Sequence, residues 1–126
     1  MASTNRVALD TNVLTAIYLF KADAFEQIKE ITGNVEFVIP RQVHDELNSL
    51  MEKNEKLKKA GRIAKELMRK NKVKVVNVDA ENADEALLQI SKDSVVATND
   101  KKLRQKIIEK GDKVIFLRQK KFLEIS

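Results

Sequence analysis

Residues 95–103 read VVATNDKKL, and this stretch decides the fold. Its first three residues, Val95 to Ala97, are apolar and predict a short buried strand, whereas Lys102 to Glu109 have the spacing of a helix. A polar turn that ends in Asp100 joins the two. A buried strand that passes into a helix through so short a turn is typical of a βαβ unit.

The same alternation of short apolar runs and helical segments extends over the whole chain. We expect five strands, at Val7–Leu9, Phe37–Ile39, Val73–Val78, Val95–Ala97 and Val114–Leu117. Phe122–Ile125 is expected to add an edge strand or to pack as a tail. Strands that alternate with helices predict an α/β fold with right-handed crossovers and a mainly parallel sheet. No internal repeat or linker divides the sequence, so residues 1–126 are expected to form one domain.

The helices are predicted from their apolar stripes and their end signals. Helical spacing runs from Val13 to Phe20 and from Ala24 to Ile31, and the aromatic residues of these segments are expected in the core. Pro40 suits the first position of the next helix. Asn82 and Glu85 resemble a capping box, and Gly111 fits a helix end. Apolar stripes mark two further helices, at Val43, Leu47, Leu50 and Met51 and at Leu57, Ala60, Ala64, Leu67 and Met68.

Composition excludes several kinds of functional site. The 126 residues include no Cys and one His, His44, which rules out disulfides and thiolate zinc sites and makes histidine-rich metal sites improbable. The lack of Cys fits a reducing compartment, and a cytoplasmic protein is expected. No apolar run reaches the roughly 20 residues of a membrane span, and no signal peptide is predicted.

The distribution of charge indicates a polyanionic partner. The net charge is +5, but residues 52–74 and 101–121 each carry a net +7, and the rest of the chain is acidic. Two basic regions of this kind favour a polyanion as a partner. Solvated, lysine-rich helix faces are an equally good interpretation of the charge alone. The candidate RNA-binding residues are Lys58, Lys59, Arg62, Lys101, Lys102, Arg104 and Lys106.

Two aspartates directly follow predicted strands. Asp10 comes after the first strand and Asp100 after the fourth. In an open α/β sheet, ligands bind outside the carboxyl ends of the strands, so both are candidates for an active site. Each also precedes a helix, where aspartate is a common N-cap, and the sequence leaves that interpretation open.

Two further acids are predicted to lie near the apolar faces of their helices. Helical geometry puts Glu46 on the flank of an apolar stripe, where a buried carboxylate needs a Lys, an Arg or a metal ion as partner. Asp84 lies in the first turn of its helix, where the helix dipole alone favours an acid. Glu85 points away from the apolar face, and Asp79 is the main rival to Asp84.

Clustered carboxylates predict a site for hard cations. Such cations take oxygen ligands, and several acids in one pocket repel one another unless cations neutralise them. A metal ion held there can activate water and neutralise charge on a phosphate. Four polar residues beside the aspartates are expected to orient ligands or water, or to make local cap and turn bonds: Thr11, Asn12, Thr98 and Asn99.

Taken together, these stretches resemble the PIN-domain family of nucleases. The resemblance covers nearly the whole chain and rests on four motifs in order: residues 7–14 (VALDTNVL), 38–47 (VIPRQVHDEL), 83–88 (ADEALL) and 95–103. It implies a three-layer α/β/α sandwich around a parallel five-stranded sheet. It also implies endoribonuclease activity with Mg²⁺ or Mn²⁺, and Asp10, Glu46, Asp84 and Asp100 as the catalytic, metal-binding acids.

The resemblance also suggests biological roles. The ending, residues 114–123, is similar to archaeal PIN proteins related to the small-subunit rRNA-processing nucleases, whose partner would be a ribosome precursor. VapC toxins, which pair with antitoxins, share the same core. Many PIN proteins form homodimers. Lys101 and Lys102 occupy the place where some members have a further acid, so a fifth ligand is in doubt.

Alternatives to a nuclease remain at this point. A non-catalytic RNA-binding module for ribosome assembly would use the same fold, although all four acids are present here. A haloacid-dehalogenase-like phosphatase would need an acid at position 12, which is Asn12. A P-loop enzyme would need a glycine-rich loop that ends in Lys, and the sequence has none.

Overall fold

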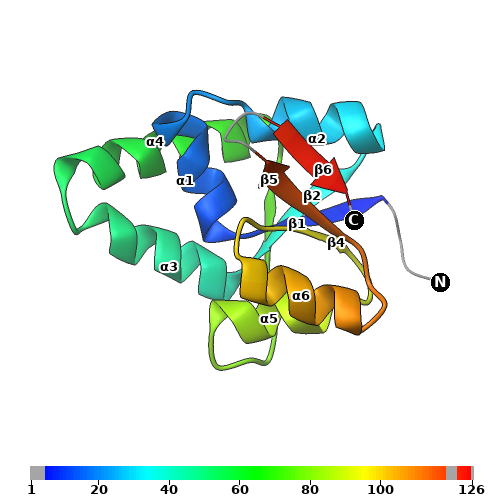
Figure 1. The fold of residues 1–126 in the computed structure, drawn as a ribbon. Coiled ribbons are helices and arrows are strands. Elements are labelled where there is room, and N and C mark those ends of the chain that lie inside the picture. Colours follow the sequence, from blue (N-terminus) through cyan, green and yellow to red (C-terminus); the bar gives the residue numbers. More distant parts are fainter. Residues whose placement is uncertain (1–4, 119–121, 126) are drawn as a thin grey trace.

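The computed structural model describes residues 5–118 and 122–125, with side chains as far as Phe116. Within these residues, six strands form one sheet in the order β3-β2-β1-β4-β5-β6 (Figure 1). The strands are β1 (Arg6–Leu9), β2 (Glu36–Pro40), β3 (Lys74–Val76), β4 (Val95–Ala97), β5 (Val114–Arg118) and β6 (Phe122–Ile125). The helices are α1 (Thr11–Leu19), α2 (Ala24–Thr32), α3 (Arg41–Met51), α4 (Glu55–Lys70), α5 (Ala83–Ile90) and α6 (Lys101–Glu109).

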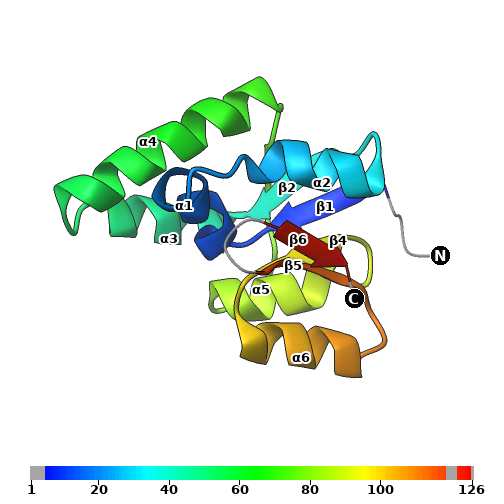
Figure 2. The ribbon, with the colours of Figure 1, turned by 45° about the horizontal axis from the view of Figure 1, so that its top comes forward.

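The sheet confirms the predicted fold class. Strands β1 to β5 are all parallel, and β6 pairs antiparallel with β5, so the segment 122–125 adds an edge strand. Figure 2 shows α2 and α4 on one side of the sheet and α5 and α6 on the other, which gives three layers. Helix α3 packs against both α4 and α5 and so joins the two outer layers at one end of the sheet.

The core follows from the apolar strands. Val7, Ala8 and Leu9 of the central strand are at most 1% exposed, because helices cover both faces of the sheet. On one face Phe25 of α2 packs edge-to-face on Phe37 of β2, with ring centroids 4.9 Å apart. Buried strands of this kind hold the turns that follow them in fixed positions.

Three sequence predictions about local structure were wrong. Pro40 is the last residue of β2 and the N-cap of α3 rather than its first helical residue. The third strand covers only Lys74–Val76, so residues 77–82 form a loop. Phe20 is 41% exposed, because α1 ends at Leu19 and the chain turns outward there.

No helix in the described residues is long and apolar enough to cross a membrane.

The order of the strands fixes where a site can form. Strand β1 lies between β2 and β4, so the connections leave it in opposite directions along the sheet. This point is where open α/β sheets bind ligands, outside the carboxyl ends of the strands. At this edge α1 begins two residues after the end of β1, α3 begins one residue after β2, and α6 begins four residues after β4 (Figure 1).

Candidate active site

Asp10 lies at the carboxyl end of β1 and is 4% exposed. Its Oδ1 accepts a hydrogen bond from the Thr11 backbone N–H at 2.7 Å, which caps α1. Its Oδ2 accepts one from the Thr98 hydroxyl at 2.6 Å and one from the Asn12 amide at 3.3 Å. The aspartate is therefore an N-cap, and it is also tied to the neighbouring strand end.

The electrostatic environment of Asp10 opposes its ionised form. Burial raises the pKa of Asp10 from 3.8 to about 6, even though the bonds from Thr98 and Thr11 lower it. The negative charges of Asp84 and Glu46 raise this pKa further. Both of these acids must therefore lie near Asp10, although they come from separate helices.

Thr98 joins the two aspartates that follow the central strands. Its hydroxyl is fully buried; it donates to Asp10 Oδ2 and accepts a hydrogen bond from the Asp100 backbone N–H at 3.1 Å. Asp100 caps α6, because its Oδ1 accepts from the backbone N–H groups of Lys102 and Leu103 at 2.9 and 3.3 Å. Among the described residues, hydrogen bonds reach only Oδ1 of Asp100.

A second bond closes the same two turns. The side-chain oxygen of Asn12 accepts a hydrogen bond from the Asn99 backbone N–H at 3.0 Å, and its amide nitrogen donates to Asp10. Asn12 is therefore more than a local turn residue, since it links positions 87 residues apart. Thr11 contributes its backbone N–H to Asp10, while its buried hydroxyl has no hydrogen-bond partner among the described residues.

Glu46 and Asp84 complete the acidic group. Partial burial has the largest effect on the pKa of Asp84 and raises it. The negative charges of Asp100 and Glu46 raise this pKa further, and the positive charge of Lys106 lowers it. Both side chains are exposed, so the argument that Glu46 is buried beside the core was wrong. The helical wheel gave its direction around α3 but not its depth. The structure thus places all four predicted acids within one electrostatic group.

The rival acids lie outside this group. Neither Asp79 nor Glu85 is among the charges that shift the pKa values of Asp10 and Asp84. Glu85 instead accepts a hydrogen bond from the Glu81 backbone N–H at 3.3 Å. His44, expected at the surface, is half-buried and lies 3.4 Å from the Asn48 amide nitrogen.

The donor set fits a hard divalent cation by its chemistry. In the part of the chain that the structure describes, none of the four acids forms an ion pair with a Lys or Arg, and only Asp84 is stabilised by a nearby cation, Lys106. No three acidic or histidine side chains among these residues lie close enough together to hold one ion in the arrangement seen. Exposed Glu46 and Asp84 are free to change rotamer, whereas Asp10 is fixed by its bonds.

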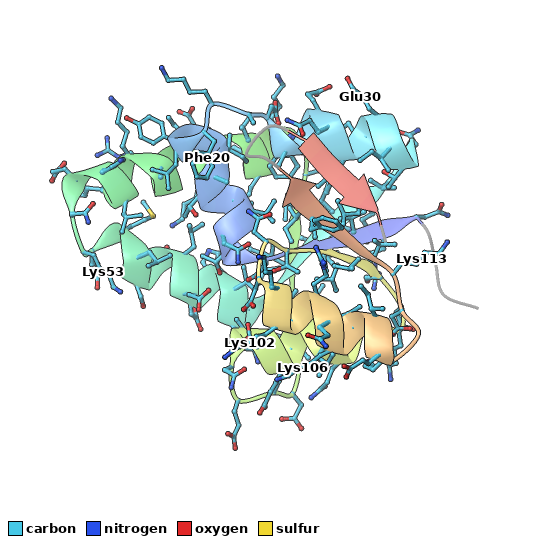
Figure 3. All side chains as sticks on the ribbon, in the orientation of Figure 1. Phe20, Glu30, Lys53, Lys102, Lys106 and Lys113 are labelled. Atoms are coloured by element: carbon cyan, nitrogen blue, oxygen red, sulfur yellow. The ribbon has the colours of Figure 1, made fainter. Side chains whose placement is uncertain are left out.

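The predicted RNA-binding residues divide into two groups. Lys101, Lys102 and Lys106 are exposed on α6, and Figure 3 shows Lys102 and Lys106 on this helix. Arg104 is stacked on Phe116 with its guanidinium 4.1 Å from the ring centroid, which makes it less available. The other group lies on α4, in the opposite layer: Lys58, Lys59 and Arg62, all exposed, with the Lys59 ammonium 5.7 Å from the Tyr18 ring centroid.

One residue of the site region was missed by sequence reasoning. Gln42, on the first turn of α3, donates two hydrogen bonds to the loop before α5. A glutamine at the start of a helix is unremarkable as a pattern, and its partners are 36 and 38 residues away. No local signal in the sequence indicates such a contact.

Comparison with known proteins agrees with this architecture. The model of the PIN-like domain family matches residues 7–120. Ribonuclease VapC4 of Methanocaldococcus jannaschii is 35% identical over 128 residues, covering 95% of each chain. Ribonuclease VapC9 of Archaeoglobus fulgidus is 35% identical over 122 residues, covering 93% of this chain and 87% of the relative.

A solved structure shows the same fold. The PIN domain endonuclease Utp24 superposes with a TM-score of 0.78 at 23% identity, and the match covers 98% of this chain and 93% of that one. The family match and the two full-length relatives confirm the resemblance that the four sequence motifs carried. The chain belongs to the PIN-like domain family.

Proposed function

We propose that this chain is an endoribonuclease that depends on Mg²⁺ or Mn²⁺. The observation that carries the proposal is the contrast within the acidic group: four carboxylates share one edge of the sheet, and the described residues provide no ion pair for any of them. Mutual repulsion of this kind is costly unless a cation relieves it. The names of the two relatives, both ribonucleases, support RNA as the substrate.

The four acids have different parts in this proposal. Asp10 and Asp100 are held at the strand ends by Thr98, and they would form the fixed part of a cation site. Glu46 and Asp84 approach from α3 and α5 and would complete it. When bound, Mg²⁺ or Mn²⁺ would supply an activated water and neutralise charge on the scissile phosphate. Thr98 keeps Asp10 oriented and favours its ionised form, which is the form that binds metal.

RNA would be held by the basic surfaces. The acids repel the phosphate backbone, so affinity must come from lysines and arginines around them. Lys106 lowers the pKa of Asp84, which places this lysine beside the acids and favours the α6 group as the contact nearest the cleaved bond. The α4 group would extend the contact along a longer RNA.

For the biological role, the comparisons favour a VapC-type toxin over rRNA processing. Both relatives that match nearly the full chain carry the VapC name, whereas the likeness to Utp24 concerns the fold alone. The partner of a VapC-type toxin would be an antitoxin, and that of an rRNA-processing nuclease a ribosome precursor. A small antitoxin gene directly upstream would support the toxin; its absence would favour rRNA processing.

The activity is tested by cleavage of total RNA with Mg²⁺ or Mn²⁺ and mapping of the new ends by sequencing. We expect specific ends with wild type and the Glu36→Gln control, and none with Asp10→Asn. Glu36 is a suitable control because it lies at the other end of the sheet, paired with Arg6 and Lys74. RNA that binds but is never cut, with either metal, would contradict the proposal and favour a non-catalytic RNA-binding module.

A further inference from the structure

The loop between β3 and α5 is held by side chains. Within the described residues, the backbone of residues 78–81 makes no hydrogen bond to another backbone group. The Gln42 amide nitrogen donates to the carbonyl oxygens of Val78 and Ala80, both at 2.8 Å. Between them, the Asp79 carbonyl accepts from the Gln89 amide at 2.9 Å. Three successive carbonyls therefore accept hydrogen bonds alternately from α3 and from α5.

The position of Gln42 connects this loop with the acidic group. Gln42 lies four residues before Glu46 on α3, so both side chains leave the helix on the same side. The loop to which it donates its hydrogen bonds continues into Asn82, the N-cap of α5, and then into Asp84 in the first turn of that helix. Gln42 is thus a direct link between the helix that carries Glu46 and the chain that carries Asp84.

The glutamine at position 42 indicates what this link between α3 and the loop requires. Both amide protons of Gln42 are used on carbonyl oxygens, while its Oε1 is buried without a hydrogen-bond partner among the described residues. An unsatisfied buried acceptor costs about 1–3 kcal/mol. A methionine of similar length would avoid that cost, so the pair of donors is what glutamine adds. Arg41 contributes one more bond, from its Nε to the Asn77 side chain at 2.9 Å, at an exposed position.

We propose that Gln42 is a positioning residue that sets the gap between Glu46 and Asp84. The inference rests on the proposed function, because the gap matters only if the two carboxylates act on one cation. A misplacement of about 1 Å in a catalytic group can reduce a rate roughly 100-fold. Without the two donors of Gln42, the loop has no other hydrogen bond from α3 to residues 78–81 in the described structure.

The test compares Gln42→Met with the matched variant Gln89→Met. Both remove a glutamine bond to the same loop, but Gln89 is on α5 and moves with Asp84, so it does not set the distance to α3. We expect Gln42→Met to speed hydrogen exchange of the amides of residues 79–86 in EDTA. We also expect it to weaken Mn²⁺ binding by about 10- to 100-fold, as for other residues that orient metal ligands.

Kinetics separate positioning from a merely structural role. Gln42→Met should lower kcat at low Mn²⁺, leave KM for RNA within twofold, and recover at high Mn²⁺; Gln89→Met should keep wild-type Mn²⁺ affinity and kcat. Unchanged exchange in Gln42→Met, or faster exchange with unchanged Mn²⁺ affinity, would overturn the inference. An equal loss of Mn²⁺ affinity in Gln89→Met would also overturn it. Failure of the proposed function is distinguishable, because wild type itself would then neither bind Mn²⁺ nor cleave RNA.

Discussion

The two ends of the sheet differ in how they accommodate carboxylates. Where β1 and β2 begin, Glu36 lies 3.4 Å from Arg6 and 3.5 Å from Lys74. Before β5, Asp112 lies 3.4 Å from Lys110 and accepts a hydrogen bond from Ser91 at 2.9 Å. At the opposite end, the acids that follow β1 and β4 form no ion pair in the described residues, and the pKa of Asp10 is raised to about 6.

The difference separates structural from functional carboxylates. Glu36 and Asp112 are neutralised by cations of the same chain. Asp10 and Asp100, at the carboxyl ends of the strands, are held by hydrogen bonds but have no ion pair in the described residues, and the raised pKa of Asp10 indicates a cost to the metal-free protein. Such a cost at one end of a sheet is typical of a functional site.

The largest expected effect comes from removing the charges at the active end. Asp10→Asn, Glu46→Gln, Asp84→Asn and Asp100→Asn should each lower RNA cleavage at least ~100-fold, because metal catalysis contributes several kcal/mol. Circular dichroism should show an intact fold in each variant. Glu36→Gln, at the other end, should cleave like wild type. Full activity in any two of the four active-end variants would refute the four-acid site.

The metal-free protein should respond to pH in the opposite sense to a protein held by ion pairs. Because the folded-state pKa of Asp10 is raised, the native state binds more protons than the unfolded state between about pH 4 and 6. Stability in EDTA should therefore fall as pH rises through this range. One unit of pKa corresponds to about 1.4 kcal/mol. The rise of the Asp10 pKa from 3.8 to about 6 therefore means that Asp10→Asn should stabilise the metal-free protein by up to about 3 kcal/mol at pH 7.

Urea unfolding in EDTA at pH 5 and pH 7 measures this effect. Asp10→Asn should flatten the pH dependence over this range. Glu36→Gln should leave that dependence unchanged and cost at most about 1 kcal/mol, since its ion pairs are exposed. A wild type that gains stability from pH 5 to pH 7, with Asp10→Asn less stable than wild type at pH 7, would show that the charge of Asp10 is compensated after all.

The hydroxyls at the two ends offer a finer comparison. Thr98→Val removes the donor to Asp10, and Ser91→Ala removes the donor to Asp112. Thr98→Val should cost about 1.5–3 kcal/mol, the usual range for a hydrogen bond to a charged group, and Ser91→Ala should cost less, because the Ser91 proton is shared between Asp112 and the Leu88 carbonyl. Only Thr98→Val should also lower cleavage and raise the pKa of Asp10 further. Equal activities of the two variants at saturating Mn²⁺ would limit Thr98 to a structural role.

Sequence reasoning located the elements better than the contacts between them. The buried strands and the aspartates that follow β1 and β4 could be predicted, because apolar runs and strand-to-helix turns are local features. The exposure of Glu46 could not, since a helical wheel gives direction without depth. Residues 77–82 are a loop although Val76 and Val78 alternate like a strand, because side chains hold this segment instead of a neighbouring strand. The hydrogen bonds from Gln42 to Val78 and Ala80 could not be predicted either, because they join residues 36 and 38 positions apart in the sequence.

The smallest expected effects concern RNA affinity. Replacement of Lys101 and Lys102 by Gln should weaken RNA binding and flatten its log–log salt dependence by roughly 0.7 per lost contact on single strands. The triple variant Lys58→Gln, Lys59→Gln and Arg62→Gln should do the same for the α4 surface. Filter binding over a range of salt measures both. An unchanged slope in the triple variant would mean that the lysines of α4 keep the helix soluble or meet a protein partner.

The central claim is that the four acids without ion pairs form a metal site, and thermal unfolding with Mn²⁺ tests it most directly. A ligand at 100 times its Kd stabilises a protein by about 2.7 kcal/mol, so millimolar Mn²⁺ should raise the Tm of wild type by several degrees. Glu36→Gln should show the same rise, and Asp10→Asn should show little or none. An equal rise in Asp10→Asn, or no rise in wild type, would contradict the account.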